Sequence, residues 1–436
     1  MKFASTKESK EFVLKKAQDH NVRFIRLWFS DILGQLKSFA ITIDELEDVM
    51  REGAGFDGAA IEGFARTDES DMRALPDAAT FQILPWRPKE NAVARMFADI
   101  VDVNARPFDG DPRQCLKKNL KKASELGYTF YVGPEMEYFY FKNSESTTLL
   151  DEGGYFDLTP LDFASDLRRE TVLTLEEMGI GVESSHHEVA PSQHEIDLRY
   201  TDALTMADSA MTYRLVVKEI ALKNNVYATF MPKPLKEYDG SGMHVHQSLF
   251  EGDKNAFFDK NDKNHLSKIA KHYIAGLLKH AREICIVTNQ WVNSYKRLTP
   301  GFDAPVELHW GKKNRSALVR VPMYKAGHEK SMRVELRSPD SACNPYLAFS
   351  VMLAAGLDGI KHEIPLSETP EQKKETPQML PQSLGEAITI AEESKFLKDA
   401  LGEHIFHSLI ENKKLEWSNY CSEITNYELK KYLPVL

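Results

Sequence analysis

The sequence of 436 residues contains few cysteines, no excess of basic side chains and no long apolar run. Its four cysteines are widely spaced and form no CxxC pair, so neither a disulfide framework nor a zinc knuckle is indicated, and a reducing, cytoplasmic compartment is expected. The formal net charge of −10 argues against nucleic acid as a partner, because binding to phosphate backbones favours a basic surface. Small anionic substrates are not excluded, since local arginines can bind them.

Membrane insertion is also not indicated. The longest apolar run, residues 346–357, is about 12 residues long, whereas a span needs roughly 20. The first residues are polar and charged and lack the apolar centre of a signal peptide. We therefore expect a protein that is neither secreted nor associated with a membrane.

The length allows two or three domains at about 150 residues each. The segment 104–112, NARPFDGDP, is dense in proline, glycine and aspartate and predicts a domain boundary. A small mixed domain is expected over residues 1–104. Its expected elements are a helix at 5–20, strands at 22–29, 35–41, 80–84 and 92–103, a glycine-rich loop at 53–60, and a helix at 43–51 opened by a capping box of Thr42 and Glu45.

The remaining residues, 113–436, are predicted to form a second, larger domain that alternates strands with helices. Helices are predicted at 113–126, 164–178, 201–224, 265–288 and 344–360. Strands are predicted at 128–141, 181–189, 193–200, 227–231, 242–250, 317–321 and 333–337. An exposed loop at 363–382 and several short helices are expected to follow.

The strand predicted at 128–141, YTFYVGPEMEYFYF, places two carboxylates in an aromatic run. Successive side chains of a strand point to opposite faces, so Glu135 and Glu137 share a face. Like charges this close repel, and burying them unpaired is costly, so we expect a divalent cation or an arginine between them. A strand whose acidic face meets solvent is the alternative.

Two further stretches add ligands of the same kind. The segment HHEVAPSQHE is predicted to be a hairpin that turns at 190–193 and brings Glu188 near Glu195. In GSGMHVHQS, the side chains of His244, His246 and Ser248 share one strand face, and the glycines allow backbone to approach a ligand closely. One such acid or histidine would more often be structural, but four carboxylates on apolar strands make a solvated face a poor explanation.

Basic residues accompany the acids. Arg333, Glu335 and Arg337 share a face of a predicted strand, and planar guanidinium groups suit carboxylate or phosphate, although some will form ion pairs with the acidic strands. Oxygen ligands with an imidazole fit Mg²⁺ or Mn²⁺ better than zinc or iron. The patterns indicate a metal-dependent enzyme of an anionic substrate, with phosphoryl transfer and two-metal hydrolysis as open alternatives.

Taken in order, the motifs resemble those of the class I glutamine synthetase family of bacteria and archaea over essentially the whole chain. The matching segments are FDGAAIEGF with ESDM, EMEYF, HHEVAPSQHEID, MPKP followed by GSGMHVHQSL, NSYKRLTPGF, NRSALVRVP, and RVELRSPD with NPYLAF. The resemblance implies an α+β fold, with an N-terminal β-grasp domain over residues 1–104 and a larger catalytic domain over residues 113–436 that has a curved antiparallel sheet and flanking helices. It also implies a homo-dodecamer of two stacked hexameric rings.

The same resemblance implies roles for individual residues. One metal ion would be held by Glu137, Glu188 and Glu195, and a second by Glu135, His244 and Glu335. Glutamate would be bound by Asp239, Gly240, Arg297, Asp303, Arg315 and Arg337. The nucleotide would be bound by Glu183, His246, Ser248, Arg315, Arg320 and Lys330. The implied catalytic residues are Asp57, supplied by a neighbouring subunit to help deprotonate ammonium, and Asp303, Arg320 and Arg337.

The implied reaction is ATP-dependent ligation of ammonium to L-glutamate, giving L-glutamine, ADP and phosphate through a γ-glutamyl phosphate intermediate. Glutamate's carboxylate is a poor electrophile, and its phosphorylation makes an acyl group that ammonia can attack. Two or three Mg²⁺ or Mn²⁺ ions per site would neutralise charge during phosphoryl transfer. The expected partners are L-glutamate, ammonium and ATP, with small regulatory proteins as further candidates.

The sequence departs from the family pattern at several positions. Asp303 stands where the family usually has glutamate, Asp239 where it mostly has asparagine, and Ala59 and Ala60 replace two serines. These departures keep open a γ-glutamyl ligase of the same fold that uses an organic amine. A non-catalytic regulatory paralog is a third hypothesis, which no lost metal ligand supports. Arg66 matches an arginine linked to feedback by glutamine.

Overall fold

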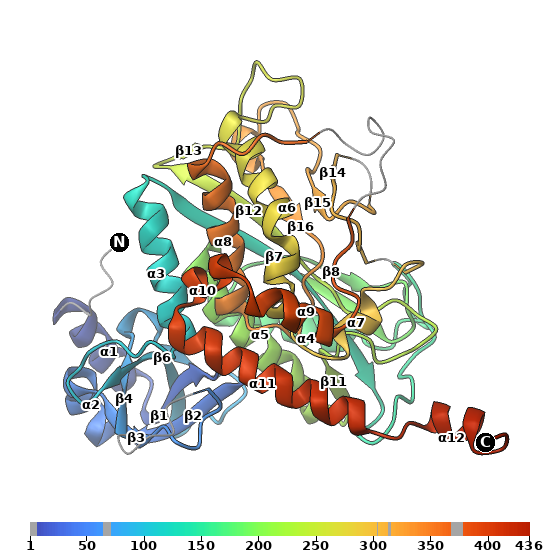
Figure 1. Cartoon of the computed structure of the whole chain (residues 1–436). Helices are drawn as coiled ribbons and strands as arrows, with labels where there is room; N and C mark the ends of the chain where they lie inside the picture. Colours follow the sequence, from blue (N-terminus) through green and yellow to red (C-terminus); the bar gives the residue numbers. More distant parts are fainter. Residues whose placement is uncertain (1–6, 64–70, 303, 313–314, 368–377) are drawn as a thin grey trace.

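The computed structural model describes residues 7–63, 71–302, 304–312, 315–367 and 378–436. Two sheets organise these residues: a smaller one from the N-terminal strands and a larger one from the remainder of the chain (Figure 1). Asp303 and Arg66 lie outside the described residues.

The N-terminal sheet has six strands in the order β2-β1-β6-β4-β3, with β5 paired to β6. Its strands are β1 (Val22–Ser30), β2 (Leu36–Thr42), β3 (Ala54–Asp57), β4 (Asp71–Pro76), β5 (Gln82–Ile83) and β6 (Ala92–Asp102). β1 and β6 are parallel, and the other pairs are antiparallel. Helices α1 (Lys7–Asp19) and α2 (Leu46–Glu52) share its core through Val13 and Leu46, which pack with Leu27 and Met96 of the sheet.

Three local expectations for this domain are wrong. Residues 54–57 of the expected glycine-rich loop form β3, because β4 supplies hydrogen-bond partners that the local sequence does not reveal. Thr42 makes no side-chain cap, and a 3₁₀ turn at Ile43–Glu45 precedes α2, which begins only at Leu46. The strand expected at 80–84 shrinks to β5, because Ala78–Thr80 forms a 3₁₀ turn capped by Asp77.

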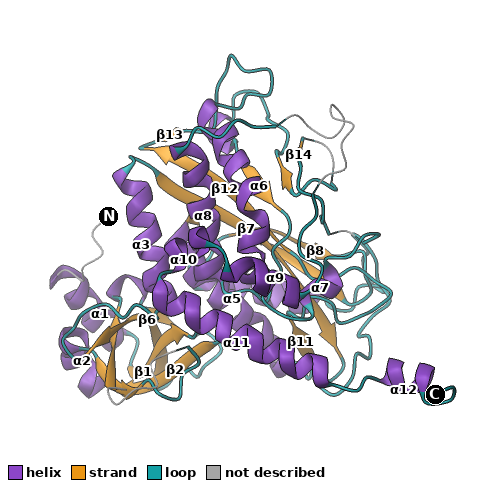
Figure 2. Cartoon of the chain, viewed as in Figure 1, coloured by secondary structure: helices purple, strands orange, loops and turns teal. Residues whose placement is uncertain are grey.

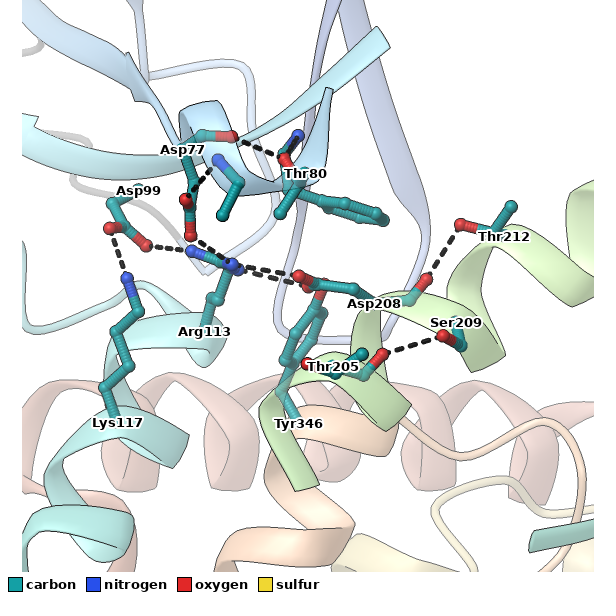
Figure 3. A network of polar contacts seen from close by, with 12 residues as sticks. Asp77, Thr80, Asp99, Arg113, Lys117, Thr205, Asp208, Ser209, Thr212 and Tyr346 are labelled. Carbon is teal, nitrogen blue, oxygen red and sulfur yellow. Dashed lines mark hydrogen bonds and ion pairs between the residues drawn. The ribbon is translucent and has the colours of Figure 1, made fainter. Parts of the chain in front are cut away.

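A buried ion network joins the two domains where α3 (Pro112–Glu125) begins (Figure 3). Arg113 pairs with Asp77 and Asp99 of the N-terminal domain at 2.8 and 2.7 Å. It also pairs at 2.9 Å with Asp208, whose carboxylate accepts a hydrogen bond from the Tyr346 hydroxyl at 2.6 Å. Burial alone would raise the pKa of Asp99, but the charges of Arg113 and of a neighbouring lysine outweigh it and lower that pKa. Three carboxylates thus share one buried arginine, and Asp99 also pairs with Lys117.

The larger sheet has ten strands along the path β14-β15-β16-β12-β7-β9-β8, with β10 and β11 paired to β7 and β13 paired to β12. Its strands are β7 (Thr129–Phe141), β8 (Val182–His187), β9 (Gln193–Leu198), β10 (Thr201–Asp202), β11 (Tyr227–Thr229), β12 (Met243–Glu251), β13 (Lys254–Asn255), β14 (Trp310–Gly311), β15 (Val319–Arg320) and β16 (Val334–Leu336). The strand pairs are antiparallel as expected, except that β14 and β15 are parallel. The sheet is therefore mixed.

Helices cover one face of this sheet, with α3, α6 and α8 in front of it in Figure 2. The helices are α4 (Ser165–Glu177), α5 (Ala203–Lys223), α6 (Lys268–Thr288), α7 (Ser294–Arg297), α8 (Pro345–Lys361), α9 (Leu384–Glu392), α10 (Lys395–Leu401), α11 (Glu403–Ser422) and α12 (Asn426–Tyr432), and Glu329–Ser331 is a 3₁₀ turn. Within the described ranges, no helix combines the length and apolar character needed to cross a membrane.

Two expectations for the C-terminal part need correction. The helices after residue 383 are not all short, since α11 spans 20 residues and lies along the body of the protein. Of the loop expected at 363–382, residues 368–377 lie outside the described part. Leu380 in that loop is buried rather than exposed, and its amide donates to the carbonyl of Val306 at 2.8 Å.

Alternation along the strands decides which side chains face the helices. On β7, Met136 and Tyr138 are buried in the core, while Glu135 and Glu137 between them are only partly buried. The same period of two operates on β12 and β16, where apolar side chains alternate with histidines and a glutamate. One face of the sheet therefore belongs to the core, and the other carries polar chemistry.

Candidate active site

The register of the larger sheet assembles the predicted site residues from strands far apart in sequence. Glu135 of β7 lies opposite His244 of β12, and Glu137 lies opposite Glu195 of β9. Glu335 of β16 lies opposite His246 on β12 and Arg320 on β15. Directly opposed residues of paired strands project from the same face. The pairing thus converts separate sequence motifs into one polar surface.

A cavity of about 340 Å³ opens on that surface. All six predicted metal ligands line it: Glu135, Glu137, Glu188, Glu195, His244 and Glu335. Arg315, Arg320 and Arg337 line the same cavity, as do Tyr155, Phe156 and His186. The structure therefore places the carboxylates, one of the predicted histidines and three of the predicted arginines around one volume.

Three groups in the described residues have ligand atoms within 4.8 Å of one another, and two of them contain predicted metal ligands: Glu135 with His246 and Glu335, and His186 with Glu188 and Glu195. Oxygen and imidazole donors of this kind fit Mg²⁺ or Mn²⁺. The groups differ from the expected sets by including His246 and His186. His244 remains close, with its Nδ1 3.4 Å from Glu135 Oε2.

His186 was missed by sequence reasoning. Its Nε2 lies 2.7 Å from Glu188 Oε1 and 3.8 Å from Glu195 Oε2. Its position two residues before Glu188 gave a same-face signal that the sequence already contained. Glu137, in contrast, uses Oε2 to accept hydrogen bonds from the Gly242 amide at 2.8 Å and from Gln193 Nε2 at 2.9 Å.

Two acids of the cavity, Glu135 and Glu195, have pKa values shifted in opposite directions. Burial raises the pKa of Glu195 well above its usual value, and the nearby carboxylates of Asp197, Glu137 and Glu188 add to the effect. Burial would also raise the pKa of Glu135, but hydrogen bonds and charges from two histidines outweigh it and lower that pKa. Crowded carboxylates that repel one another in this way are stabilised by added positive charge.

The arginines occupy different depths. Arg320 pairs through Nε with Glu335 Oε2, and Arg337 Nε lies 3.2 Å from Glu335 Oε1, so Glu335, fully buried, has a cation on each oxygen. Arg297 is buried and donates to the carbonyls of Ser338 and Pro339 at 2.7 and 3.1 Å. It therefore lies behind the cavity wall rather than in the described lining.

Gly240 is packed against Arg297. A Cβ at Gly240 would lie 2.1 Å from the Pro232 carbonyl oxygen and 3.2 Å from Arg297 Cγ, so only glycine fits there. Asp239 precedes it next to Lys233, whose pKa is lowered mainly by burial and only partly restored by the Asp239 charge. Of the residues expected to bind glutamate, Arg315 and Arg337 thus line the cavity, and Gly240 and Arg297 lie beside each other.

A second cavity of about 310 Å³ adjoins the first and shares Glu135, Ser184 and Asp197 with it. Four of the six residues expected to bind nucleotide line it: Glu183, His246, Ser248 and Lys330. The other two, Arg315 and Arg320, line the first cavity. The two expected binding regions are therefore neighbours that meet at Glu135.

Asp57 does not join either cavity within one chain. It ends β3, is exposed, and accepts a hydrogen bond from the Ala59 amide at 2.8 Å. Figure 1 shows β3 at the lower edge of the N-terminal domain, whereas β8 and β16 lie near the middle of the view, above it and to its right. The described linings of both cavities do not include it.

Together, the fold and the cavities define an enzyme-like architecture, with a small N-terminal sheet domain joined to a larger domain whose mixed sheet presents acids, histidines and arginines to a paired cavity. The family model of the glutamine synthetase β-grasp domain matches residues 21–103, and that of the glutamine synthetase catalytic domain matches residues 109–432. The chain belongs to the glutamine synthetase family. This confirms the expected resemblance and fold class.

Individual relatives agree. The chain is 53% identical to a glutamine synthetase of Mycolicibacterium smegmatis, covering 97% of this chain and 99% of the relative. It is 48% identical to a glutamine synthetase of Methanosarcina mazei, covering 100% and 99%. Among solved structures, it is similar to the GmaS/ADP complex, with TM-score 0.87 and 30% identity over 97% of this chain and 99% of the other. The Plasmodium falciparum glutamine synthetase gives TM-score 0.89 and 25% identity, covering 99% and 100%.

Proposed function

We propose that this chain ligates ammonium to L-glutamate at the expense of ATP, forming L-glutamine, ADP and phosphate through γ-glutamyl phosphate. One observation carries the proposal: a single cavity gathers six acid and histidine ligands with three arginines and meets a second cavity lined by four nucleotide-site candidates. The full-length similarity to glutamine synthetases supports the same reaction.

Two or three Mg²⁺ or Mn²⁺ ions, once bound, would supply positive charge to the phosphoryl oxygens. In this proposal Glu137, Glu188 and Glu195 hold one ion, and Glu135, His244 and Glu335 hold the second. His186 and His246, adjacent to these acids, orient them through hydrogen bonds. The donor chemistry of the cavity fits these cations, as argued above.

The chain's own arginines share the electrostatic work. Arg320 and Arg337 flank Glu335 at the cavity wall and are placed to neutralise charge on the transferring phosphoryl group. Arg315 and Arg337 would bind carboxylates of glutamate, with Arg297 holding the backbone at 337–339 behind them. Asp303 would contribute to closure over the intermediate, as the family resemblance suggests.

We propose that Asp57 reaches the site from a neighbouring subunit and helps remove a proton from ammonium. The distance of β3 from the cavity strands in one chain supports this assignment. The C-terminal segment supports assembly too, because it extends from the body with Ile424, Leu433, Val435 and Leu436 largely exposed. A homo-dodecamer of two stacked hexameric rings in the cytoplasm is the assembly we propose.

An organic amine as the acceptor is the alternative suggested by Asp303 and Asp239. The relatives named glutamine synthetase, which are 53% and 48% identical to this chain over 97% and 100% of its length, favour ammonium. The test is phosphate release from ATP and glutamate with ammonium, methylamine, ethanolamine or a polyamine as acceptor. We expect the highest catalytic efficiency with ammonium. A clearly higher value with an organic amine would replace this proposal, and no turnover with any acceptor would leave only a binding role.

A further inference from the structure

Asp151, in the loop between β7 and α4, contacts the hairpin that carries Glu188 and Glu195. Asp151 lies between β7 and α4 and is buried with its side chain fully covered. Its Oδ1 is 3.0 Å from His187 Nε2 and accepts a hydrogen bond from the Ser192 amide at 2.8 Å. One carboxylate therefore contacts both sides of the hairpin.

Ser192 completes the connection from the hairpin turn. Its φ of 63° lies in the left-handed region, which is unfavourable for a residue other than glycine. Its hydroxyl accepts hydrogen bonds from the amides of Leu150 and Asp151 at 2.8 and 3.0 Å. In this conformation both the hydroxyl and the amide of Ser192 contact the loop, and these bonds stabilise it.

The buried group Asp151, His187 and His194 also has ligand atoms within 4.8 Å of one another, so a metal site must be considered. The hydrogen bonds argue against it. His187 Nδ1 lies 2.7 Å from the Glu188 carbonyl oxygen and its Nε2 lies 3.0 Å from Asp151 Oδ1, so both ring nitrogens already have hydrogen-bonding partners. Arg168 donates to His194 Nδ1 at 2.8 Å, which leaves the proton of that ring on Nε2. Each of these three side chains already has a partner among the described residues, and the group lines neither cavity.

We propose that Asp151, His187 and Ser192 form a clasp that positions Glu188 and Glu195 for metal binding. His187 contacts the Glu188 carbonyl oxygen through Nδ1 and Asp151 Oδ1 through Nε2, so this series of contacts fixes the backbone at Glu188. The loop held by the clasp also brings Tyr155 and Phe156 to the cavity wall. Asp151 is a positioning residue, since it does not line either cavity in the described part of the chain.

This inference rests on the proposed function, because it concerns one of the two proposed metal sites. Groups that orient metal ligands typically change affinity by about 10–100-fold when removed. Asp151→Asn keeps the shape and the acceptor oxygen but removes the charge that pairs with His187. We expect it to weaken Mn²⁺ binding about tenfold at the Glu137, Glu188 and Glu195 site and to leave the other site unchanged.

The two sites can be separated by measuring Mn²⁺ binding to the full-length protein by electron paramagnetic resonance. In a Glu335→Gln background, the remaining binding reports the site near the clasp, and adding Asp151→Asn should weaken it. In a Glu137→Gln background, adding Asp151→Asn should change nothing. Ser192→Ala removes only the hydroxyl hydrogen bonds and should weaken Mn²⁺ binding at the same site by a smaller factor. It therefore tests the clasp independently if Asp151→Asn fails to fold.

Asp358→Asn provides the matched control. It breaks another aspartate–histidine pair, with His280 at 2.8 Å, away from both cavities. It should leave both Mn²⁺ affinities unchanged. Unchanged binding in Asp151→Asn, or equal weakening of both sites, would overturn the clasp. If Glu137→Gln and Glu335→Gln fail to remove separate ions, the metal assignment itself is wrong and the clasp with it.

Discussion

Mixing two inactive variants provides the sharpest test of the shared active site. Asp57→Asn damages the N-terminal domain, and Glu335→Gln damages the cavity of the larger domain. Under the proposed assembly, each site takes Asp57 from one subunit and Glu335 from the next. In randomly mixed rings, a site receives an intact Asp57 with probability one half and an intact Glu335 with probability one half, so about a quarter of the sites should be active.

The assay is glutamine formation by rings reassembled from separated subunits carrying distinguishable tags, with mixed composition verified by sequential affinity purification. Each variant alone should be nearly inactive. Rings of Glu137→Gln mixed with Glu335→Gln serve as the matched control. Glu137 and Glu335 line the same cavity, so every subunit of the mixed ring carries one defect in its own cavity and no site is intact. That mixture should stay inactive.

A site built within one chain gives a different result. Each subunit would then carry one defect or the other, and no mixed ring would contain an intact site. Verified mixed rings of Asp57→Asn and Glu335→Gln that stay inactive, while each variant assembles normally, would refute the shared site. Asp57 would then have to act within its own chain or not at all.

Further predictions concern the metal site, the domain junction and the helix packing. Glu335→Gln should abolish most activity and remove one Mn²⁺ ion in binding titrations without lowering the melting temperature greatly, and full turnover would contradict its role. Arg113→Met should cost about 3–5 kcal/mol in denaturant unfolding because it leaves buried carboxylates unpaired, whereas Arg51→Met on the surface of α2 should change little. The pKa of Asp99 is lower in the folded protein than its usual value. The stability contributed by its ion pair with Arg113 is therefore present above the unfolded pKa of Asp99 and is lost as pH falls through its folded pKa. The loss of unfolding free energy in Arg113→Met should accordingly become smaller in acid. Gly276→Ala should destabilise the protein, because its Cβ would lie 2.1 Å from the Ala355 carbonyl oxygen of α8, and an unchanged melting temperature would show that the helices can separate.

Much of the site could be predicted from local periodicity. The sharing of one face of β7 by Glu135 and Glu137, and of one face of β12 by His244 and His246, follows from the two-residue repeat of a strand, and the structure confirms both. Helices such as α5 and α8 were expected within a few residues of their bounds, because their apolar lengths and capping residues are local signals.

Other features depended on partners distant in the sequence. β3 has no strand signal of its own and forms because β4 pairs with it. Asp151 supports the site only because the loop before α4 folds over the β8–β9 hairpin. A local pattern cannot specify such contacts, because they are decided by which surfaces pack together.

The sequence by itself determined which side chains share a strand face and which segments are helical, because both depend on neighbours only a few residues away. Only the tertiary structure decided that β7, β9, β12, β15 and β16 pair in a register that puts Glu335 beside Arg320 and Glu135 opposite His244. That register joins residues up to about 200 positions apart, and it is set by burial of the shared core and by the hydrogen bonds between strands.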